Sequence, residues 1–283
     1  MSLVINTNVA SLNAQRNLSN TQGALAKNLS HLSSGMRISS ASDDAAGLAI
    51  SENLKAQIRS TSQAERNASD GVSLSQVAEG ALEQVGNLLT RMRELAVEAS
   101  NGTVDTNSAI YLNNEFNALR SEIDRISKVT AFNNKNLLDG TLSGGVNLQV
   151  GINNSANDVI SLAISNIGSA LIGIGGASAQ TLAAAAIDTQ GNSQTALATL
   201  DQALTQVNSS RAGLGAIQNR LQVTITNLST AHENLSAANS RIRDVDVASE
   251  TAMLTRFQIL SQAGIAVLAQ ANQLPSMALS LLK

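Results

Sequence analysis

Residues 193–242, SQTALATLDQALTQVNSSRAGLGAIQNRLQVTITNLSTAHENLSAANSRI, carry an aliphatic residue at every seventh position. The residues with this spacing are Leu200, Val207, Leu214, Leu221, Leu228, Leu235 and Ile242. A repeat of 3.5 residues kept over this length is typical of a helix that packs lengthwise against other helices. At about 1.5 Å per residue, the stretch predicts a rod of roughly 65 Å. The chain has no proline before Pro275, so nothing in this rod is forced to kink.

A second stripe lies three residues before the first and becomes half polar along its length. Its members are Leu197, Leu204, Arg211, Gln218, Ile225, His232 and Asn239. We therefore expect a helix over about 193–239 that needs neighbouring helices to cover it.

Three other segments space their apolar residues by threes and fours, which predicts further helices. They cover residues 3–32, about 45–100 and about 105–128. Ser42-Asp43-Asp44 is a plausible N-cap region for the second of these helices, and Asn101-Gly102 is a strong stop signal. The expected core stripe of that helix is Val77, Ala81, Val85, Leu88, Met92 and Leu95.

The stretch between the third helix and the heptad helix is not helical in character. Residues 133–136 and 140–145 are expected to be loops, and the alternating apolar residues of 146–164 predict a β-hairpin. Residues 165–192 are expected to form a short irregular outer segment. The fold class is thus mainly α: long antiparallel helices forming a coiled-coil or bundle rod, with a small β-hairpin region.

The composition argues against catalysis and against several kinds of partner. Aromatic residues make up 1% of the 283, whereas branched aliphatics and Ala, which fill narrow interhelical seams, are abundant. A net charge of −3 disfavours a nucleic-acid or anionic-membrane partner, and the chain has no Cys and two distant histidines, His31 and His232. We expect no catalytic, metal or cofactor site, and hence no enzyme.

Local motifs that suggest chemistry are incomplete. His232-Glu233 lacks the second histidine of a zinc-protease helix, since Ser236 stands there. The glycines of residues 173–176 lack the third member of a dinucleotide-binding loop. The pair Asp43-Asp44 has no acid, base or metal partner nearby, so we expect it to cap a helix.

No membrane span or signal peptide is expected. Residues 159–187 carry no charge, but four glycines and several polar residues interrupt their apolar run. The N-terminal residues lack a basic start and an apolar core of signal-peptide length.

Both ends of the chain are helix-prone and apolar. Ordering a backbone residue costs about 1–2 kcal/mol, which a lone amphipathic segment recovers only if its apolar stripe is covered. Two arrangements stay open at this point. The ends fold against other copies or partners, or they pair only with each other in the monomer.

Several motifs at the two ends resemble those of bacterial flagellins. They are Ile5-Asn-Thr-Asn8 with Leu12-Asn13, SGMRISSASDDAAGLAIS at 34–51, SRIRDVD at 240–246, QILSQAG at 258–264, LAQANQ at 268–273 and LSLL at 279–282. The resemblance covers roughly 1–165 and 193–283, and these motifs are highly specific.

The resemblance implies a structural subunit that self-assembles into the flagellar filament used for motility. Residues 1–44 and 240–283 would form a terminal coiled coil lining the filament channel, and 45–239 an outer rod domain. About 30 residues separate the hairpin from the heptad helix, too few for the large outer β domains of many relatives. Assembly would bury the stripes at Ile5, Val9, Leu12, Leu268, Leu274 and Leu281.

The resemblance also implies partners and a location. The subunit would pass through the flagellar export apparatus without a cleaved signal peptide, with an export chaperone on its C-terminal segment. It would then meet the cap and the hook–filament junction proteins at the extracellular filament. Arg91, Leu95 and Glu115 resemble the surface that Toll-like receptor 5 recognises in many flagellins. The alternative is that Leu95 is a seam residue and the other two are surface charges.

Other classes of protein remain as alternatives. A hook–filament junction protein has similar ends but forms a short collar, and the fit of residues 34–51 favours flagellin over it. The cytoplasmic helical hairpin of a chemoreceptor is also rich in Ala, Ser and heptads, but it gives no role to the apolar ends or to the 146–164 hairpin. An export-apparatus adaptor or an adhesin is a more distant alternative.

Overall fold

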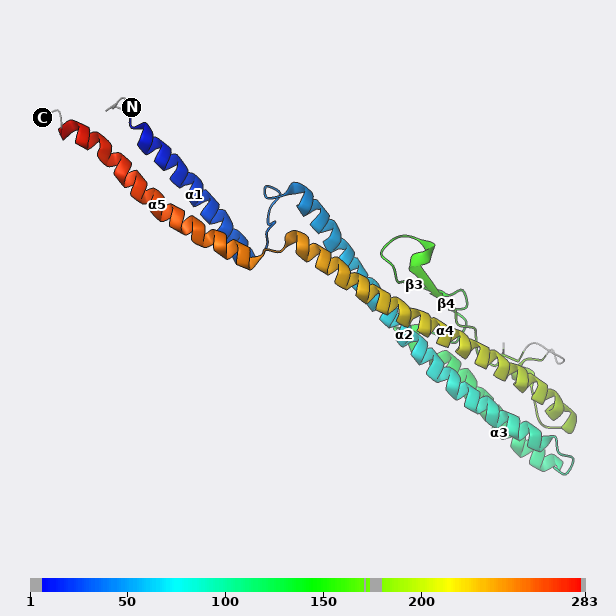
Figure 1. Cartoon of the computed structure of the whole chain (residues 1–283). Helices are drawn as coiled ribbons and strands as arrows, with labels where there is room; N and C mark the ends of the chain where they lie inside the picture. Colours follow the sequence, from blue (N-terminus) through cyan, green and yellow to red (C-terminus); the bar gives the residue numbers. More distant parts are fainter. Residues whose placement is uncertain (1–6, 171, 174–179, 281–283) are drawn as a thin grey trace. The chain divides into compact units, whose positions relative to one another are not determined.

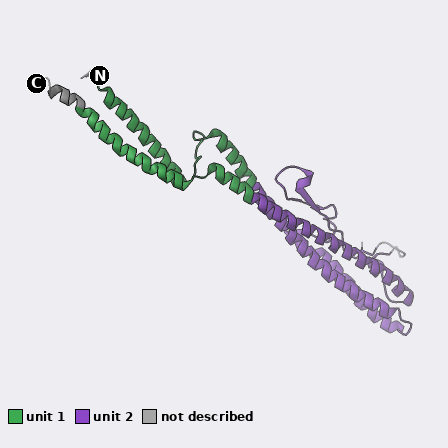
Figure 2. Cartoon of the chain, viewed as in Figure 1, with its two compact units in different colours: residues 1–58, 233–283 green, residues 59–232 purple. Residues whose placement is uncertain are grey.

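The computed structural model describes residues 7–170, 172–173 and 180–280, with the side chains of 274–280 excepted. The chain divides into two compact units (Figure 2). Unit 1 comprises residues 1–58 and 233–283, and unit 2 comprises residues 59–232. The architecture is mainly α, as the sequence predicts, with long antiparallel helices and two small pairs of strands.

Unit 1 is built on two terminal helices that lie side by side (Figure 1). Helix α1 spans Val9–Ser34 and helix α5 spans Val247–Ser280. The Asn8 side chain caps α1 by accepting from the Ser11 amide at 3.0 Å, and Gly35, at φ 70°, ends the helix in the left-handed region that glycine favours. Asn8 Nδ2 donates to the Ala271 carbonyl at 2.7 Å, and Asn28 Nδ2 donates to the Glu250 carbonyl at 3.2 Å, so the pair is antiparallel.

The remainder of unit 1 joins the terminal pair to two longer helices. Helix α2, Ala45–Ala99, and helix α4, Gln190–Arg243, begin or end here and continue into unit 2. Met36 forms an antiparallel β-bridge with Asp244. Asp44 Oδ1 accepts from the Gly47 amide at 2.9 Å, so the second aspartate of the Asp43-Asp44 pair caps α2 as the sequence predicts.

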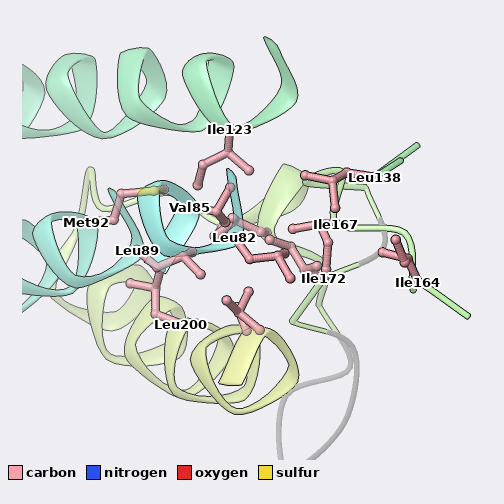
Figure 3. Packing of buried hydrophobic residues seen from close by; sticks show 14 of the residues in the cluster. Leu82, Val85, Leu89, Met92, Ile123, Leu138, Ile164, Ile167, Ile172 and Leu200 are labelled. Carbon is pink, nitrogen blue, oxygen red and sulfur yellow. The ribbon is translucent and has the colours of Figure 1, made fainter. Parts of the chain in front are cut away.

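Unit 2 packs α2 and α4 against helix α3, Thr106–Val129. Figure 3 shows Leu82, Val85, Leu89 and Met92 of α2 facing Ile123 of α3 and Leu200 of α4. Of the heptad stripe on α4, the first four residues are buried and the last three are half-buried.

The core stripe of α2 differs from the expected one at its N-terminal end. The residues of α2 buried in the main cluster of unit 2 are Leu74, Ala78, Leu82, Val85, Leu89, Met92, Leu95, Ala96 and Ala99, whereas Val77 is 42% exposed. Ala81 and Leu88 are partly buried instead and share a groove with Ile126 and Thr130, at the end of α3. Val77 lies one turn before Ala81, toward the N-terminus of α2. We attribute its exposure to the end of α3 at Val129.

Strands occupy two short hairpins. Strands β1, Ala131–Phe132, and β2, Lys135–Asn136, are antiparallel where the sequence suggested a loop. Their turn places Asn133 and Asn134 at φ 46° and 63°, which asparagine tolerates better than most residues. The expected hairpin forms between β3, Val146–Gln149, and β4, Val159–Leu162, in the register Val146↔Leu162, with the 3₁₀ turn η1, Ala156–Asp158, between them.

Part of the expected irregular segment, 165–192, belongs to the core of unit 2. Apart from the 3₁₀ turn η2, Leu182–Ala184, and the first turn of α4, its described residues are irregular. Its buried apolar residues are Ile167, Ile172, Leu182, Ala185 and Ile187. The segment thus fills space beside α2 and α4, a role that its composition did not predict.

Candidate functional site: an exposed apolar surface

The terminal helices expose more large apolar side chains than a self-contained pair would leave in water. On α1 these are Val9, Leu12 and Leu29, and on α5 they are Val247, Met253, Ile259, Leu260, Ile265 and Val267. Their exposed fractions run from 44% to 61%. We call these nine residues the terminal apolar surface.

The contrast with unit 2 shows that unit 1 has little core of its own. Among the described residues of unit 1, the buried apolar residues are Ile38 and Ala271, and every other buried apolar residue belongs to unit 2. Helix α5 is apolar around most of its circumference, a property typical of helices that are covered on all sides. Since α1 covers one face only, other faces of α5 are available to a further partner.

The structure places some of the six predicted assembly residues on this surface. Val9 is 61% exposed, Leu12 is 57% exposed and Leu268 is half-buried. Ile5 and Leu281 lie outside the described residues, as does the side chain of Leu274.

Most of the exposed residues of α5 were not predicted individually. The signal that could have identified them is the near absence of charge from Met253 onward, where Arg256 is the one charge before Lys283. Without periodic charge, the sequence does not say which faces are covered by α1 and which are open.

A polar joint fixes the other end of the α1–α5 pair. Lys27 Nζ lies 2.9 Å from Asp43 Oδ1, and His31 Nδ1 lies 3.2 Å from Glu250 Oε1, with His31 Nε2 3.8 Å from Asp43. The Lys27 ammonium, together with the Ser40 amide, holds the pKa of the Asp43 carboxyl well below its usual range. The joint connects α1, the 35–44 linker and the first turn of α5 by polar contacts rather than by apolar packing.

The three predicted receptor-binding residues are close together but not equally accessible. Arg91 Nη2 lies 2.9 Å from Glu115 Oε1, joining α2 to α3, and Arg91 Nη1 lies 3.0 Å from Glu94 Oε2. The hydrogen bonds that Arg91 donates to these carboxylates, the one to Glu94 first, raise the pKa of Arg91. Leu95 is fully buried in the core of unit 2. An external partner therefore meets Arg91 and Glu115 directly, and Leu95 only through the packing beneath them.

The described residues contain no group of three or more His, Asp or Glu side chains placed to hold a metal ion. By length and composition, Val247–Gln273 would also suffice for one membrane span, with a mean hydropathy of 1.3. A single such helix is weak support for a membrane protein. One face of this segment already packs on α1, through Asn8 and Asn28.

Comparison with known proteins gives a consistent result over the whole chain. Residues 5–143 match the model of the bacterial flagellin N-terminal helical region, and residues 197–282 match that of the C-terminal helical region. A flagellin of Halalkalibacterium halodurans is 48% identical over 281 residues, covering 99% of this chain and all of the relative. A flagellar filament 33 kDa core protein of Treponema phagedenis is 40% identical over 290 residues, again covering 99% and 100%. A solved structure of a putative flagellar hook-associated protein from Vibrio parahaemolyticus shares the fold, with a TM-score of 0.60 at 16% identity over 71% of this chain and 100% of its own.

Proposed function

Since the chain belongs to the bacterial flagellin family, whose members are structural subunits of the flagellar filament, we propose that its terminal apolar surface is where its copies join. The observation that carries this proposal is the imbalance of burial. Nine large apolar side chains of α1 and α5 are exposed, while the same unit buries little apolar surface of its own. Covering such side chains releases about 25 cal/mol for each Å² removed from water, which favours assembly of copies into a lattice.

The two ends of the chain would have a common place in the filament. We propose that residues 1–44 and 240–283 form the inner layer that lines the channel, and that 45–239 form the outer rod. The division of the chain into two compact units supports this arrangement, since residues 59–232, the larger part of the proposed rod, have their own core.

Substitution on the terminal apolar surface tests the proposal. Leu12→Asp and Ile265→Asp each place a carboxylate where an apolar neighbour is expected, and a buried unpaired charge is costly. Both variants should remain monomeric when short filament seeds are added, as seen by negative-stain electron microscopy. Asn20→Asp is the matched control, because it adds the same charge at an exposed polar position of α1. Filaments of normal length from both apolar-to-Asp variants would overturn the proposal.

Truncation gives a second and broader test. Deleting residues 268–283 removes the last part of α5. Unit 2 of the truncated chain should stay folded, but the truncated chain should be unable to elongate filament seeds. Leu268→Asp should weaken elongation less completely, because Leu268 is already half-buried.

We also propose the partners and the route that the family resemblance implies. The chain would leave through the flagellar export apparatus without a cleaved signal peptide, with a chaperone covering its C-terminal helix, and would join a filament bounded by junction and cap proteins. The apolar circumference of α5 supports the proposal that a chaperone binds this helix, since such a surface must be kept from water before assembly. Loss of chaperone capture on deleting 268–283, with capture retained by the Leu12→Asp variant, is the expected result.

We further propose that Toll-like receptor 5 recognises the monomer through Arg91 and Glu115. The exposed ion pair between α2 and α3 supports this proposal, and Leu95 would act by holding α2 in place from the core. Reporter-cell signalling should fall with Arg91→Ala and with Glu115→Ala. A double variant as potent as the wild type would reject these residues.

A further inference from the structure

The loop between α2 and α3 contains a chemically distinctive pair, Asn101-Gly102. This is the one Asn-Gly dipeptide in the sequence. Both residues are exposed, and they lie just beyond the end of α2 at Ala99. Glycine has no Cβ to hinder the approach of its backbone nitrogen to the preceding side chain, and it samples backbone conformations closed to other residues.

The hydrogen bonds of the loop leave the reacting groups free. Asn101 Oδ1 accepts from the Thr103 amide at 3.4 Å, and the Asn101 carbonyl accepts from the Val104 amide at 3.1 Å. Within the described chain, neither the side-chain amino group of Asn101 nor the backbone amide of Gly102 has a hydrogen-bond partner. On the other side, Gln190 Nε2 donates to the Ser100 carbonyl at 3.2 Å and fixes the end of α2, not the dipeptide.

We propose that Asn101 is a site of spontaneous deamidation in the folded protein. The Gly102 nitrogen, losing its proton to solvent, forms a bond to Asn101 Cγ, and the side-chain amide leaves as ammonia. The resulting five-membered imide then takes up one water, which opens either of its two carbonyls. The products are aspartate or isoaspartate at 101, and the balance is one water consumed and one ammonia released.

Two related dipeptides show why the loop matters. Asp70-Gly71 lies inside α2, where the helical hydrogen bonds occupy the backbone amides. Asp139-Gly140 lies in a turn, but Thr141 and Asn136 donate to the Asp139 carboxylate and lower its pKa. An ionised carboxylate is a poor target for a nucleophile, so neither aspartate should form the imide readily.

The modification would change the charge at the C-terminal end of a 55-residue helix. Each converted chain is one unit more negative than the formal −3, at a helix end where the dipole already disfavours negative charge. Glu98, one turn earlier, adds to the local negative charge. The converted protein is therefore a separable acidic form.

The experiment incubates the purified full-length chain in warm, mildly alkaline buffer and follows each asparagine by peptide mapping with mass spectrometry. Asn101 should change from amide to acid about tenfold faster than Asn154, an exposed asparagine followed by Ser155, because glycine removes the steric barrier. Part of the product should elute as the isoaspartyl isomer. Equal rates at Asn101 and Asn154 would overturn the proposal.

Gly102→Ala is the matched variant. Gly102 is not among the glycines at positive φ, and a Cβ there would meet just Gln190 Nε2, at 3.9 Å, so the fold should tolerate alanine. Its helical circular dichroism should equal that of the wild type, while deamidation at 101 slows about tenfold. An unchanged rate would contradict the mechanism.

The same digest after incubation in urea separates sequence from structure. If the native loop permits the reaction, the rates of the native and unfolded chains at Asn101 should agree within about tenfold, since the loop imposes no helical restraint. A native rate suppressed by more than about tenfold would show that the fold protects Asn101, and would overturn the proposal.

Discussion

Single glycines of α2 differ in what surrounds them, and the difference predicts opposite effects for one substitution. Gly80 has nothing within 4 Å of the position where a Cβ would stand, so Gly80→Ala should raise the free energy of unfolding by about 0.5–1 kcal/mol. A Cβ at Gly71 would overlap Leu148 Cδ1 of β3 and lie 3.2 Å from Leu221 Cδ1 of α4. Gly71→Ala should therefore lose most or all of that gain. Urea unfolding followed by circular dichroism compares the two, and equal stabilisation would contradict the close packing of the hairpin on α2.

The polar joint at Asp43 predicts a dependence on acid pH. Its pKa in the folded chain lies below the unfolded value of about 3.9, so the ionised carboxylate stabilises unit 1 throughout neutral pH. That stabilisation is lost as the pH falls below about 4 and through the folded pKa. Asp43→Asn should be less stable than wild type at neutral pH, and its stability should change less on acidification. Denaturation curves of both proteins at a series of pH values provide the measurement, and parallel pH profiles would contradict the assignment.

At the scale of elements, the α2–α4 contact contains a polar layer within an apolar seam. Glu79 of α2 accepts from Gln218 Nε2 at 3.0 Å and lies 4.0 Å from Arg211 Nη2, while the buried Arg211 Nε has no partner among the described residues. Arg211→Met removes that unpaired donor and continues the apolar stripe, and should stabilise the chain by about 1 kcal/mol.

Glu79→Met makes the complementary change on α2. It leaves the Arg211 guanidinium beside the seam without its carboxylate, so it should destabilise the chain where Arg211→Met stabilises it. The midpoints of urea unfolding distinguish the two variants. If both variants were more stable than the wild type, the Glu79 carboxylate would not be compensating the Arg211 guanidinium, and the prediction would be wrong.

Element boundaries were largely readable from the sequence because their signals are local. The Asp44 cap and the Asn101-Gly102 stop delimit α2 within a residue of the expected range, at Ala45 and Ala99. The face that α2 buries was harder to predict from the sequence, since Val77 fits the apolar periodicity as well as Leu74 does. Which of the two is covered depends on where α3 ends, and that is a relation between segments remote in sequence.

At the scale of the whole molecule, the two units should differ in their ability to fold alone. Unit 2 contains nearly all of the buried apolar residues, so a fragment of residues 59–232 should unfold cooperatively and remain monomeric. Thermal circular dichroism and analytical ultracentrifugation of the fragment test both statements. A fragment without a cooperative transition, at a temperature where the intact chain is folded, would show that unit 2 depends on the terminal helices.

The sequence by itself determined the fold class, the helical segments, the 146–164 hairpin and the family, because periodicity, caps and motifs are written in neighbouring residues. It also indicated that both chain ends are apolar, but it left open what covers them. Only the tertiary structure decided that α1 occupies one face of α5 and leaves Ile259, Ile265 and Val267 exposed. It likewise decided that Val77 of the expected core stripe is exposed, and that described residues of the 165–192 segment fill the core beside α2 and α4. The physical reason is that burial is a property of pairs of segments, and a single periodic stripe does not specify which partner covers it.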